Sequence, residues 1–133
     1  MLKAELPVRR TDKHGSGAWG APRGGRKHRG VDYACHDGTI IFSATLGVVT
    51  KIGYPYCDDL SYRYVEVTDA NNNRYRYFYL SPLVTKGEAV TNSTPLGMVQ
   101  DLQKRYKHIT NHCHVEVKNG DDYLNPEMML AGL

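Results

Sequence analysis

The sequence contains no long apolar segment. None of its 133 residues belongs to a stretch that could span a bilayer, and the N-terminal residues lack the apolar run of a signal peptide. The 3 cysteines, Cys35, Cys57 and Cys113, are an odd number without C-x-x-C spacing, which argues against a disulfide framework or a structural zinc knuckle. We therefore expect a soluble protein with free thiols, made in the cytoplasm and not inserted in a membrane.

Strong charge is also missing. The formal net charge is +3, lower than most nucleic-acid-binding domains carry, so we expect no nucleic-acid partner. Interleaved arginines and tyrosines at 74–79 leave a nucleic-acid-binding β-barrel as an alternative, which salt-dependent oligonucleotide binding would test. Basic residues do cluster near the N-terminus, as a solvated surface or as a face that suits an anionic partner. They are Arg9, Arg10, Lys13, Arg23, Arg26, Lys27 and Arg29.

The residues that are present favour β-structure. Hydrophobic residues make up 41% of the chain, enough for one core, and 10 tyrosines and 13 glycines accompany many alternating Val, Thr and Ile. We expect a mainly β fold with little helix, in which residues 1–18 form an irregular arm and residues 19–133 a single domain. A short helix is predicted over 101–107. Strands are predicted near 31–35, 39–44, 47–53, 61–68, 73–80, 95–100 and 112–118.

The most informative motif is His112-Cys113-His114. Side chains alternate faces along a strand, so both imidazoles project from one face while Cys113, Val115 and Val117 project from the other. The two histidines then lie about 6.6 Å apart along the backbone, close enough for one to bind a metal ion while the other handles the attacking water. Two surface histidines on a half-exposed strand would give the same pattern.

A second cluster supplies further metal ligands. His28 and Asp32 flank Gly30 in the segment His28-Arg29-Gly30-Val31-Asp32, and neutral imidazole and carboxylate are ligands that catalytic zinc takes alongside water. A fully extended chain would place the two side chains about 13 Å apart, too far to share one ion. Gly30 can take a positive φ or a bulged conformation that turns both side chains to a common point. We therefore predict a loop that enters a strand.

Ordered motifs along most of the chain resemble those of the lysostaphin-type peptidase family, the zinc endopeptidases called M23, which cleave peptide bonds in bacterial peptidoglycan. The segment from His28 to Asp32 matches the family's H-x-G-x-D zinc motif, and His112 to Val117 corresponds to H-L-H-F-E-V. The other matches are Trp19 to Arg23 with the opening G-x-R segment, Gly38 to Val49 with G-T-P-V-x-A…G-x-V, Tyr77 to Ser81 with Y-x-H-L-S, Val84 to Val90 with V-x-x-G-x-x-V, Leu96-Gly97 with I-G, and Asn125-Pro126 with the terminal D-P.

The resemblance implies a compact antiparallel β-sheet fold, a sandwich or barrel-sandwich hybrid. It also implies one zinc ion per chain, bound by His28, Asp32 and His114, with His112 as the catalytic histidine. The family's second active-site histidine, in Y-x-H-L-S, is replaced here by Tyr79. The family's G-x-T-G-x-S-T-G-P run is likewise missing before His112. A tyrosine hydroxyl can still donate a hydrogen bond to a developing oxyanion, so Tyr79 is a candidate catalytic residue.

The function implied by the resemblance is that of a monomeric, zinc-dependent endopeptidase that hydrolyses a cross-bridge or a stem peptide of bacterial peptidoglycan. Because no secretion signal is present, we expect a bacteriophage lytic or virion-associated hydrolase. It would be made in the host cytoplasm and reach the cell wall after release or with the virion. The alternative is a catalytically degenerate peptidoglycan-binding module of the same fold. Loss of peptidoglycan turbidity, with and without a chelator, separates the two.

Other polar and aromatic residues are assigned less direct roles. By strand parity Glu116 shares the face of the two histidines, as a partner of the metal ligands or as a surface carboxylate. Tyr75, Tyr77 and Tyr79 share one face of their stretch, and for the first two we favour packing. Cys113 faces away from the imidazoles and is expected in the core. The histidines without a ligand-like context are His14, His36 and His108.

Overall fold

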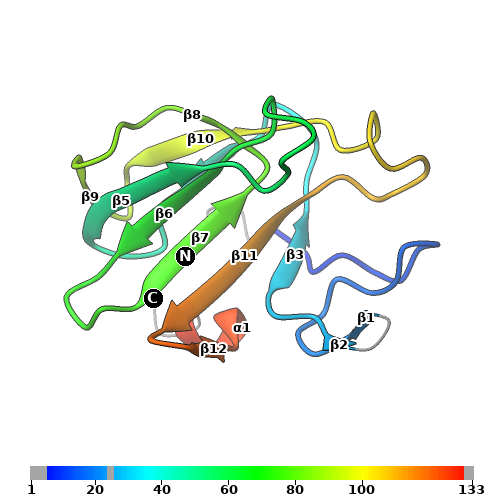
Figure 1. The fold of residues 1–133 in the computed structure, drawn as a ribbon, viewed down its shortest axis with the longest axis horizontal. Coiled ribbons are helices and arrows are strands. Elements are labelled where there is room, and N and C mark those ends of the chain that lie inside the picture. The colour runs from blue at the N-terminus through cyan, green and yellow to red at the C-terminus, as the bar shows by residue number, and fades with distance from the viewer. Residues whose placement is uncertain (1–5, 24–25, 131–133) are drawn as a thin grey trace.

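The computed structural model describes residues 6–23 and 26–130, and these are built mainly of antiparallel strands (Figure 1). The strands are β1 (Pro22–Arg23), β2 (Arg26–Lys27), β3 (Val31–Ala34), β4 (Ile40–Phe42), β5 (Gly47–Gly53), β6 (Tyr64–Thr68), β7 (Arg74–Phe78), β8 (Leu80–Pro82), β9 (Ala89–Val90), β10 (Pro95–Val99), β11 (His112–Asn119) and β12 (Asp122–Leu124), and the helix is α1 (Pro126–Leu130). The expected fold, mainly β with little helix, is confirmed.

Two sheets enclose one hydrophobic core. The larger has the strand order β12-β11-β7-β6-β5-β9, with β3 also paired to β11, and the smaller has the order β4-β10-β8. Val65 and Val67 of β6 and Val115 and Val117 of β11 are fully buried, and burial of each such side chain contributes roughly 1.5 to 3 kcal/mol. The smaller sheet adds Ile41, Leu80, Leu96 and Val99 to the same cluster.

The opposite face of the large sheet carries polar side chains because strand residues alternate in direction. Glu66, Arg76 and Glu116 are register partners on β6, β7 and β11. Arg76 Nε donates to Glu66 at 2.7 Å, and Arg76 Nη1 lies 3.8 Å from Glu116. The candidate site lies at the end of this polar face, where β11 meets β3.

The described part of the N-terminal arm is hydrogen-bonded to β3. The Arg9 N–H donates to the Asp32 carbonyl at 2.6 Å, and the Ala34 N–H donates to the Pro7 carbonyl at 2.7 Å. The Asp32 N–H in turn donates to the Gly17 carbonyl at 2.9 Å. Arm residues on either side of a turn thus hold the strand that carries Asp32.

The strand predicted at 73–80 is interrupted at Tyr79. This residue has a positive φ of 69°, which redirects the chain from β7 in the large sheet to β8 in the small one. The interruption also corrects the parity expected from the sequence. Tyr75 and Tyr77 are buried in the core as predicted, whereas Tyr79 packs against a separate cluster with Tyr62.

The helix predicted over 101–107 is wrong, and the segment forms turns. The Tyr106 N–H reaches the Leu102 carbonyl at 2.9 Å, but His108 then takes a φ of 63° and ends the helical course. Asp101 Oδ1 accepts the Gln103 N–H at 2.9 Å, a side-chain turn rather than a helix cap. So short a segment has too few internal hydrogen bonds to form a helix without a packed face.

Sequence reasoning also missed short elements, among them β9, β12 and α1. A signal for α1 was present: Asn125 Oδ1 accepts the Glu127 N–H at 3.1 Å, which is an N-cap contact, and Pro126 occupies the first helical position. No helix in the described part of the chain is long and apolar enough to cross a membrane. The 3 cysteines are free, as expected, and Cys113 is buried in the core.

Candidate metal centre and groove

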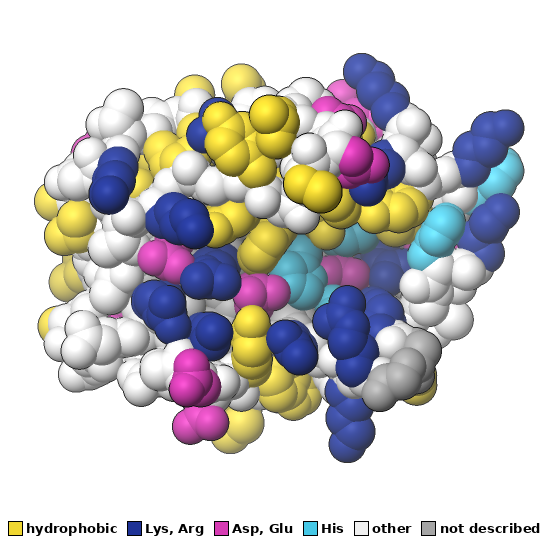
Figure 2. All heavy atoms as spheres, in the orientation of Figure 1, with side chains coloured by type: hydrophobic (Ala, Val, Ile, Leu, Met, Phe, Trp, Pro, Cys, Tyr) yellow, Lys and Arg dark blue, Asp and Glu magenta, His cyan; other side chains and the backbone are white. Residues whose placement is uncertain are grey.

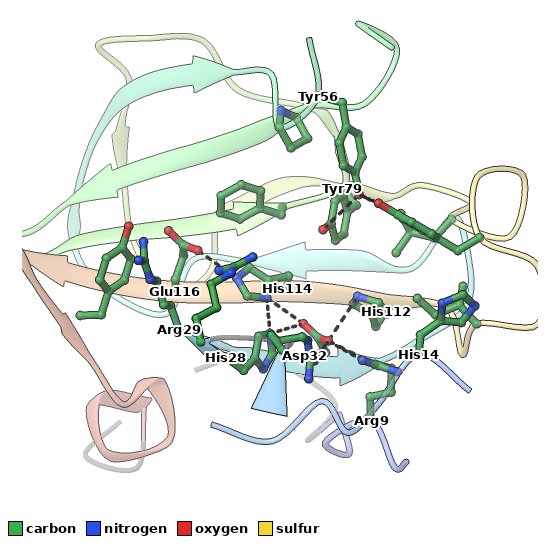
Figure 3. Close-up of a pocket in the computed structure, with 18 residues that line it drawn as sticks. Arg9, His14, His28, Arg29, Asp32, Tyr56, Tyr79, His112, His114 and Glu116 are labelled. Carbon is green, nitrogen blue, oxygen red and sulfur yellow. Dashed lines mark hydrogen bonds and ion pairs between the residues drawn. The ribbon is translucent and has the colours of Figure 1, made fainter. Parts of the chain in front are cut away.

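His28, Asp32 and His114 each bring one ligand atom to a common point (Figure 3). His28 Nε2 lies 3.1 Å from His114 Nδ1 and 3.3 Å from Asp32 Oδ1, and His114 Nδ1 lies 2.7 Å from Asp32 Oδ1. Asp32 and His114 meet because they are register partners on β3 and β11. His28 approaches from the loop between β2 and β3. The residues predicted as a ligand set from the sequence are therefore brought together.

Gly30 makes this convergence sterically possible. A Cβ atom at this position would lie 2.3 Å from the Val115 carbonyl oxygen and 2.7 Å from His114 Cε1. The glycine is required because β11 passes so close to the backbone. The chain bends at Gly30 as predicted, but φ is not positive there, so the left-handed conformation considered from the sequence is not used.

The partners of both imidazoles direct a lone pair toward the common point. His28 Nδ1 lies 3.0 Å from the Ala18 carbonyl, which can only accept a hydrogen bond. His114 Nε2 lies 2.9 Å from Glu116 Oε1, which accepts in the same way when ionised. The remaining nitrogens, His28 Nε2 and His114 Nδ1, are thus the ones that would give up a proton and bind a cation at this point. Glu116 thereby takes the first of the two roles considered from the sequence.

This donor set fits a zinc ion. Three acceptor atoms face one another at 2.7 to 3.3 Å, close to the separation of about 3.3 Å between tetrahedral ligands that bind zinc at about 2.05 Å. Without a cation the cluster holds a proton. Burial lowers the pKa of His114, but the Asp32 and Glu116 carboxylates outweigh burial and raise it to about 9. Burial raises the pKa of Asp32, but the hydrogen bonds from His114 and His28 outweigh burial, so this pKa lies far below its ordinary value.

His112 lies beside the cluster without joining it. Its Nδ1 is 2.8 Å from the Thr110 carbonyl, which accepts the Nδ1 proton and leaves Nε2 with a free lone pair. Nε2 faces the second oxygen of Asp32 at 3.5 Å. Burial lowers the pKa of His112, although the Asp32 charge acts in the opposite sense. The imidazole is therefore neutral near pH 7 and able to accept a proton.

A groove of about 480 Å³ passes over these residues. Figure 2 shows histidine and acidic side chains at the floor of a hollow, with Lys and Arg side chains along its rim. One side, which we call the ligand wall, consists of His28, Asp32, His112 and His114. The other side carries Tyr56 and Tyr79. Together with Tyr106, which also lines the groove and whose hydroxyl contacts that of Tyr56, they form what we call the tyrosine wall.

The hydroxyl groups of the tyrosine wall form a chain. Tyr106 donates to the Tyr56 hydroxyl at 3.0 Å, and Tyr56 donates to the Tyr79 hydroxyl at 3.4 Å. The Tyr79 ring meets the His112 ring edge-on, with centroids 5.6 Å apart. Burial raises the pKa of Tyr79 well above its ordinary value, so the hydroxyl stays protonated. Because Tyr79 accepts from Tyr56, its own proton remains available to a ligand in the groove.

The groove includes residues that sequence reasoning missed. His14 was assigned no site context, yet it lines the groove, and its Nε2 lies 2.8 Å from the Lys107 carbonyl. Arg9 was treated only as part of a basic cluster, and Tyr56 and Tyr106 were not singled out. None of these residues belongs to a recognisable spacing motif. The remaining histidines, His36 and His108, line a separate hollow.

The fold and the clustered ligands define a β-sheet protein with a site suited to hydrolytic metal chemistry. Residues 26–126 match the model of peptidase family M23, and the chain belongs to that family. It is 29% identical over 120 residues to mouse (Mus musculus) leukocyte cell-derived chemotaxin-2, covering 90% of this chain and 79% of that protein.

Two solved structures share the fold. The structure of lysostaphin superposes with a TM-score of 0.72 at 18% identity, covering 97% of this chain and 55% of lysostaphin. The catalytic domain of EnpA, a prophage-encoded M23 protein from Enterococcus faecalis crystallised as a point mutant, superposes with a TM-score of 0.70 at 22% identity, covering 96% of this chain and 93% of that domain. The lysostaphin-type fold expected from the sequence motifs is thus confirmed.

Proposed function

We propose that this protein is a zinc-dependent endopeptidase that hydrolyses peptide bonds in bacterial peptidoglycan. Membership of a peptidase family and the lysostaphin-like fold support a peptidase that acts on the cell wall. The observation that carries the proposal is the convergence of His28, Asp32 and His114, with the free Nε2 of His112 beside them in an open groove. Zinc held by such ligands supplies Lewis acidity, which acidifies a water molecule and polarises a carbonyl oxygen.

His112 acts as the general base in this proposal. Its Nε2 faces the cluster and carries a lone pair, because Nδ1 donates to the Thr110 carbonyl. Nε2 accepts the proton of the attacking water as the new C–O bond forms, and it then returns the proton to the departing amine. The Thr110 carbonyl accepts the Nδ1 proton throughout the cycle, so Nε2 is the nitrogen that takes up and releases the transferred proton.

Tyr79 takes the place of the family's second histidine as an oxyanion donor. Its buried hydroxyl keeps its proton at neutral pH, and it faces the groove opposite the ligand wall (Figure 3). It donates a hydrogen bond to the carbonyl oxygen as negative charge develops there. The Tyr106–Tyr56–Tyr79 chain orients that donor, because each hydroxyl in the chain donates to the next.

We also propose a bacteriophage source, with release from the host cytoplasm or transport in the virion. EnpA, which shares the fold, is itself prophage-encoded, and this supports the proposal. The substrate bond, a cross-bridge or a stem peptide, is identified by mass spectrometry of the muropeptides released.

The decisive experiment measures loss of turbidity of purified peptidoglycan. We expect the wild-type protein loaded with zinc to clear the suspension, and both chelator treatment and His112→Ala to stop clearing. Added zinc should restore the chelated wild type but not the variant. Clearing that persists unchanged in chelator would contradict metal dependence, and absence of clearing across several wall types would contradict the hydrolase.

The second candidate function is a peptidoglycan-binding module without turnover. It is favoured by Tyr79, which stands where the family has a histidine, and by the relative named as a chemotaxin rather than a peptidase. Co-sedimentation with peptidoglycan, without release of soluble fragments, would support this function. The neutral His112 imidazole has a free lone pair on Nε2 and lies beside an intact ligand set. This arrangement favours the enzyme, because binding alone does not require a general base.

A further inference from the structure

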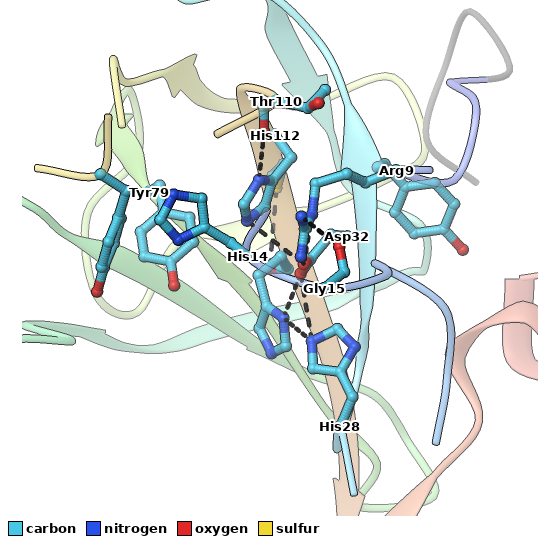
Figure 4. Close-up of polar contacts among 12 residues, drawn as sticks. Arg9, His14, Gly15, His28, Asp32, Tyr79, Thr110 and His112 are labelled. Atoms are coloured by element: carbon cyan, nitrogen blue, oxygen red, sulfur yellow. Dashed lines mark hydrogen bonds and ion pairs between the residues drawn. The ribbon is translucent and has the colours of Figure 1, made fainter. Parts of the chain in front are cut away.

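Arg9, a buried arginine of the N-terminal arm, forms an ion pair with Asp32, one of the three proposed metal ligands. Arg9 is 2% exposed and Asp32 is 3% exposed. Both Nε and Nη2 of Arg9 lie 3.1 Å from Asp32 Oδ2, the oxygen that does not face the histidine ligands (Figure 4). Arg23 Nη2 is farther away, at 3.7 Å, and donates to the Ser16 carbonyl. Arg9 is therefore the principal cation that determines which Asp32 oxygen remains for the metal.

Arg9 is also connected to His112, through contacts made by Asp12 and Thr110. Arg9 Nη1 lies 2.8 Å from Asp12 Oδ2, and this oxygen accepts the Thr110 N–H at 2.9 Å. The carbonyl of Thr110 is the partner of His112 Nδ1, at 2.8 Å. An unbroken series of contacts therefore runs from Asp32 through Arg9, Asp12 and the Thr110 residue to His112.

The arm is held in place by its own backbone. The Arg9 N–H donates to the Asp32 carbonyl, the Asp32 N–H donates to the Gly17 carbonyl at 2.9 Å, and the Gly17 N–H donates to the Arg9 carbonyl at 3.0 Å. A Cβ atom on Gly17 would lie 2.5 Å from Arg9 Cβ and 2.9 Å from Asp32 Cβ. Arg9 Nη1 also donates to the Gly15 carbonyl at 2.9 Å. The guanidinium is therefore fixed by the fold of the arm as well as by its charge.

We infer that the arm is part of the metal centre, with Arg9 as the positioning residue of Asp32 and Asp12 as the positioning residue of His112. Both residues precede the segment 26–126 that matches the family model. The part that concerns Asp12 rests on the proposed function, because it assigns His112 a catalytic role. The part that concerns Arg9 needs only that the cluster binds a metal ion.

The physical reason lies in the two oxygens of a carboxylate. A buried carboxylate that binds a metal through one oxygen needs hydrogen bonds at the other, and loss of such outer partners typically lowers metal affinity by about 10- to 100-fold. With Arg9 in place, Oδ2 is occupied and Oδ1 remains directed at His28 and His114. Without Arg9, the carboxylate is freer to rotate, and its buried Oδ2 keeps only the more distant Arg23, at 3.7 Å, as a cationic partner.

The first test compares zinc affinity in Arg9→Met and Arg10→Met, measured on metal-free protein by competition with a chromogenic chelator. Arg10 is the exposed neighbour of Arg9 on the same arm and serves as the matched control. We expect Arg9→Met to bind zinc about 10- to 100-fold more weakly and Arg10→Met to bind it as the wild type does. A folded Arg9→Met protein with wild-type zinc affinity would overturn the role of Arg9.

A conservative variant keeps this test decisive if Arg9→Met does not fold. Arg9→Lys retains the positive charge but lacks the planar fork that reaches Asp32 and Asp12 together. We expect its zinc affinity to lie between those of wild type and Arg9→Met, and the visible spectrum of bound cobalt(II) to change as the ligand geometry changes. Wild-type affinity together with a wild-type cobalt spectrum would overturn the role of Arg9.

The second test separates Asp12 from Arg9. Asp12→Ala removes the acceptor of the Thr110 N–H, so the Thr110 carbonyl is released and His112 loses its fixed tautomer. We expect kcat on peptidoglycan fragments to fall by about 10- to 100-fold with little change in KM, and nitrogen NMR of the zinc-loaded protein to show a mixture of His112 tautomers. Lys13→Ala, at an exposed arm position, is the control. A single unchanged tautomer in Asp12→Ala would overturn the role of Asp12.

These readouts distinguish the arm from the proposed function. If the wild type cleaves no peptidoglycan, the endopeptidase proposal fails, while the zinc affinities and the His112 tautomer still decide whether the arm organises the centre. If the wild type is active and the Arg9 and Asp12 variants match their controls in zinc affinity and tautomer, the arm inference fails alone.

Discussion

The two walls of the groove are built differently. The ligand wall takes Asp32, His112 and His114 from paired strands, so their positions follow from the register of β3 and β11. The tyrosine wall takes Tyr56 and Tyr106 from loops and Tyr79 from a strained junction between β7 and β8. A sheet sets positions to within a fraction of an ångström, which metal ligation requires, whereas loops vary more readily.

The comparison indicates that the two walls have different roles. In the proposed function the ligand wall would hold the metal and the general base, and each of its three imidazoles has a neighbour that fixes its tautomer. The tyrosine wall contributes hydroxyl donors that reinforce one another through a chain. Substitution of His28, Asp32 or His114 in the ligand wall should therefore abolish binding of the metal, while substitutions in the tyrosine wall should reduce turnover and spare the metal.

The largest effect is expected from substitution of a metal ligand. His28→Ala, Asp32→Ala and His114→Ala each leave two ligands, too few for tight zinc binding, so bound zinc and peptidase activity should be lost together. Elemental analysis of purified proteins, paired with the turbidity assay, measures both. Full activity in zinc-free protein would show that this wall does not work through a metal.

His112→Ala should break the chemistry of the ligand wall while sparing its metal. Three ligands survive, so we expect stoichiometric zinc, but kcat should fall by about 10²- to 10⁴-fold because the proton of the attacking water has no acceptor. Steady-state kinetics and elemental analysis on the same preparation test the pair of outcomes. Loss of zinc in this variant would mean that His112 and His114 have exchanged roles.

Tyr79→Phe probes the opposite wall with the smallest change in shape. The ring stays and the donor is removed, so we expect kcat to fall by about 10- to 10³-fold with zinc content and fold unchanged. Kinetics on purified wall fragments measure this effect, and thermal unfolding serves as the control. Wild-type kcat with altered stability would make Tyr79 a packing residue and the tyrosine wall a passive surface.

The walls should also differ in their response to pH. Because carboxylates raise the pKa of His114 to about 9 against the opposing effect of burial, the metal-free cluster holds a proton below that pH and must release it to bind zinc. The apparent zinc affinity should therefore fall as pH falls, by about tenfold per pH unit between pH 8 and 6. Titrations with a competing chelator measure the slope. Burial raises the pKa of Tyr79, so its hydroxyl does not titrate in this range and Tyr79→Phe should leave the slope unchanged. A zinc affinity that does not change with pH in the wild type would contradict the assignment to His114.

Much of the ligand wall could be predicted from the sequence because its information is local. The alternation of His112, Cys113 and His114 gives one polar and one apolar face whatever the partner strand is. The flanking of Gly30 by His28 and Asp32 indicated a bend, although the reason for the glycine proved to be the close passage of β11. Strand positions were predicted well for the same reason, since buried and exposed residues alternate along them.

The tyrosine wall and the arm could not be predicted in this way. Tyr79 was expected on the face of Tyr75 and Tyr77, but its positive φ reverses that parity, and no residue pattern announces a positive φ at a tyrosine. Tyr56 and Tyr106 are 50 residues apart in the chain and meet through their hydroxyls at 3.0 Å. Such contacts depend on the conformations of loops that pack against the sheet, and these have no local sequence signal.

The sequence by itself determined the class of fold and, through its resemblance to the family, the candidate ligand set and the departure at Tyr79, because the motifs that carry the resemblance are residue types at short spacing. Only the tertiary structure decided which nitrogen of each histidine faces the cluster, that Arg9 occupies Asp32 Oδ2, and that Asp12 reaches Thr110 across 98 residues. These are contacts between distant segments, and their geometry is set by strand register and by the path of the arm around β3, neither of which has a local sequence signal.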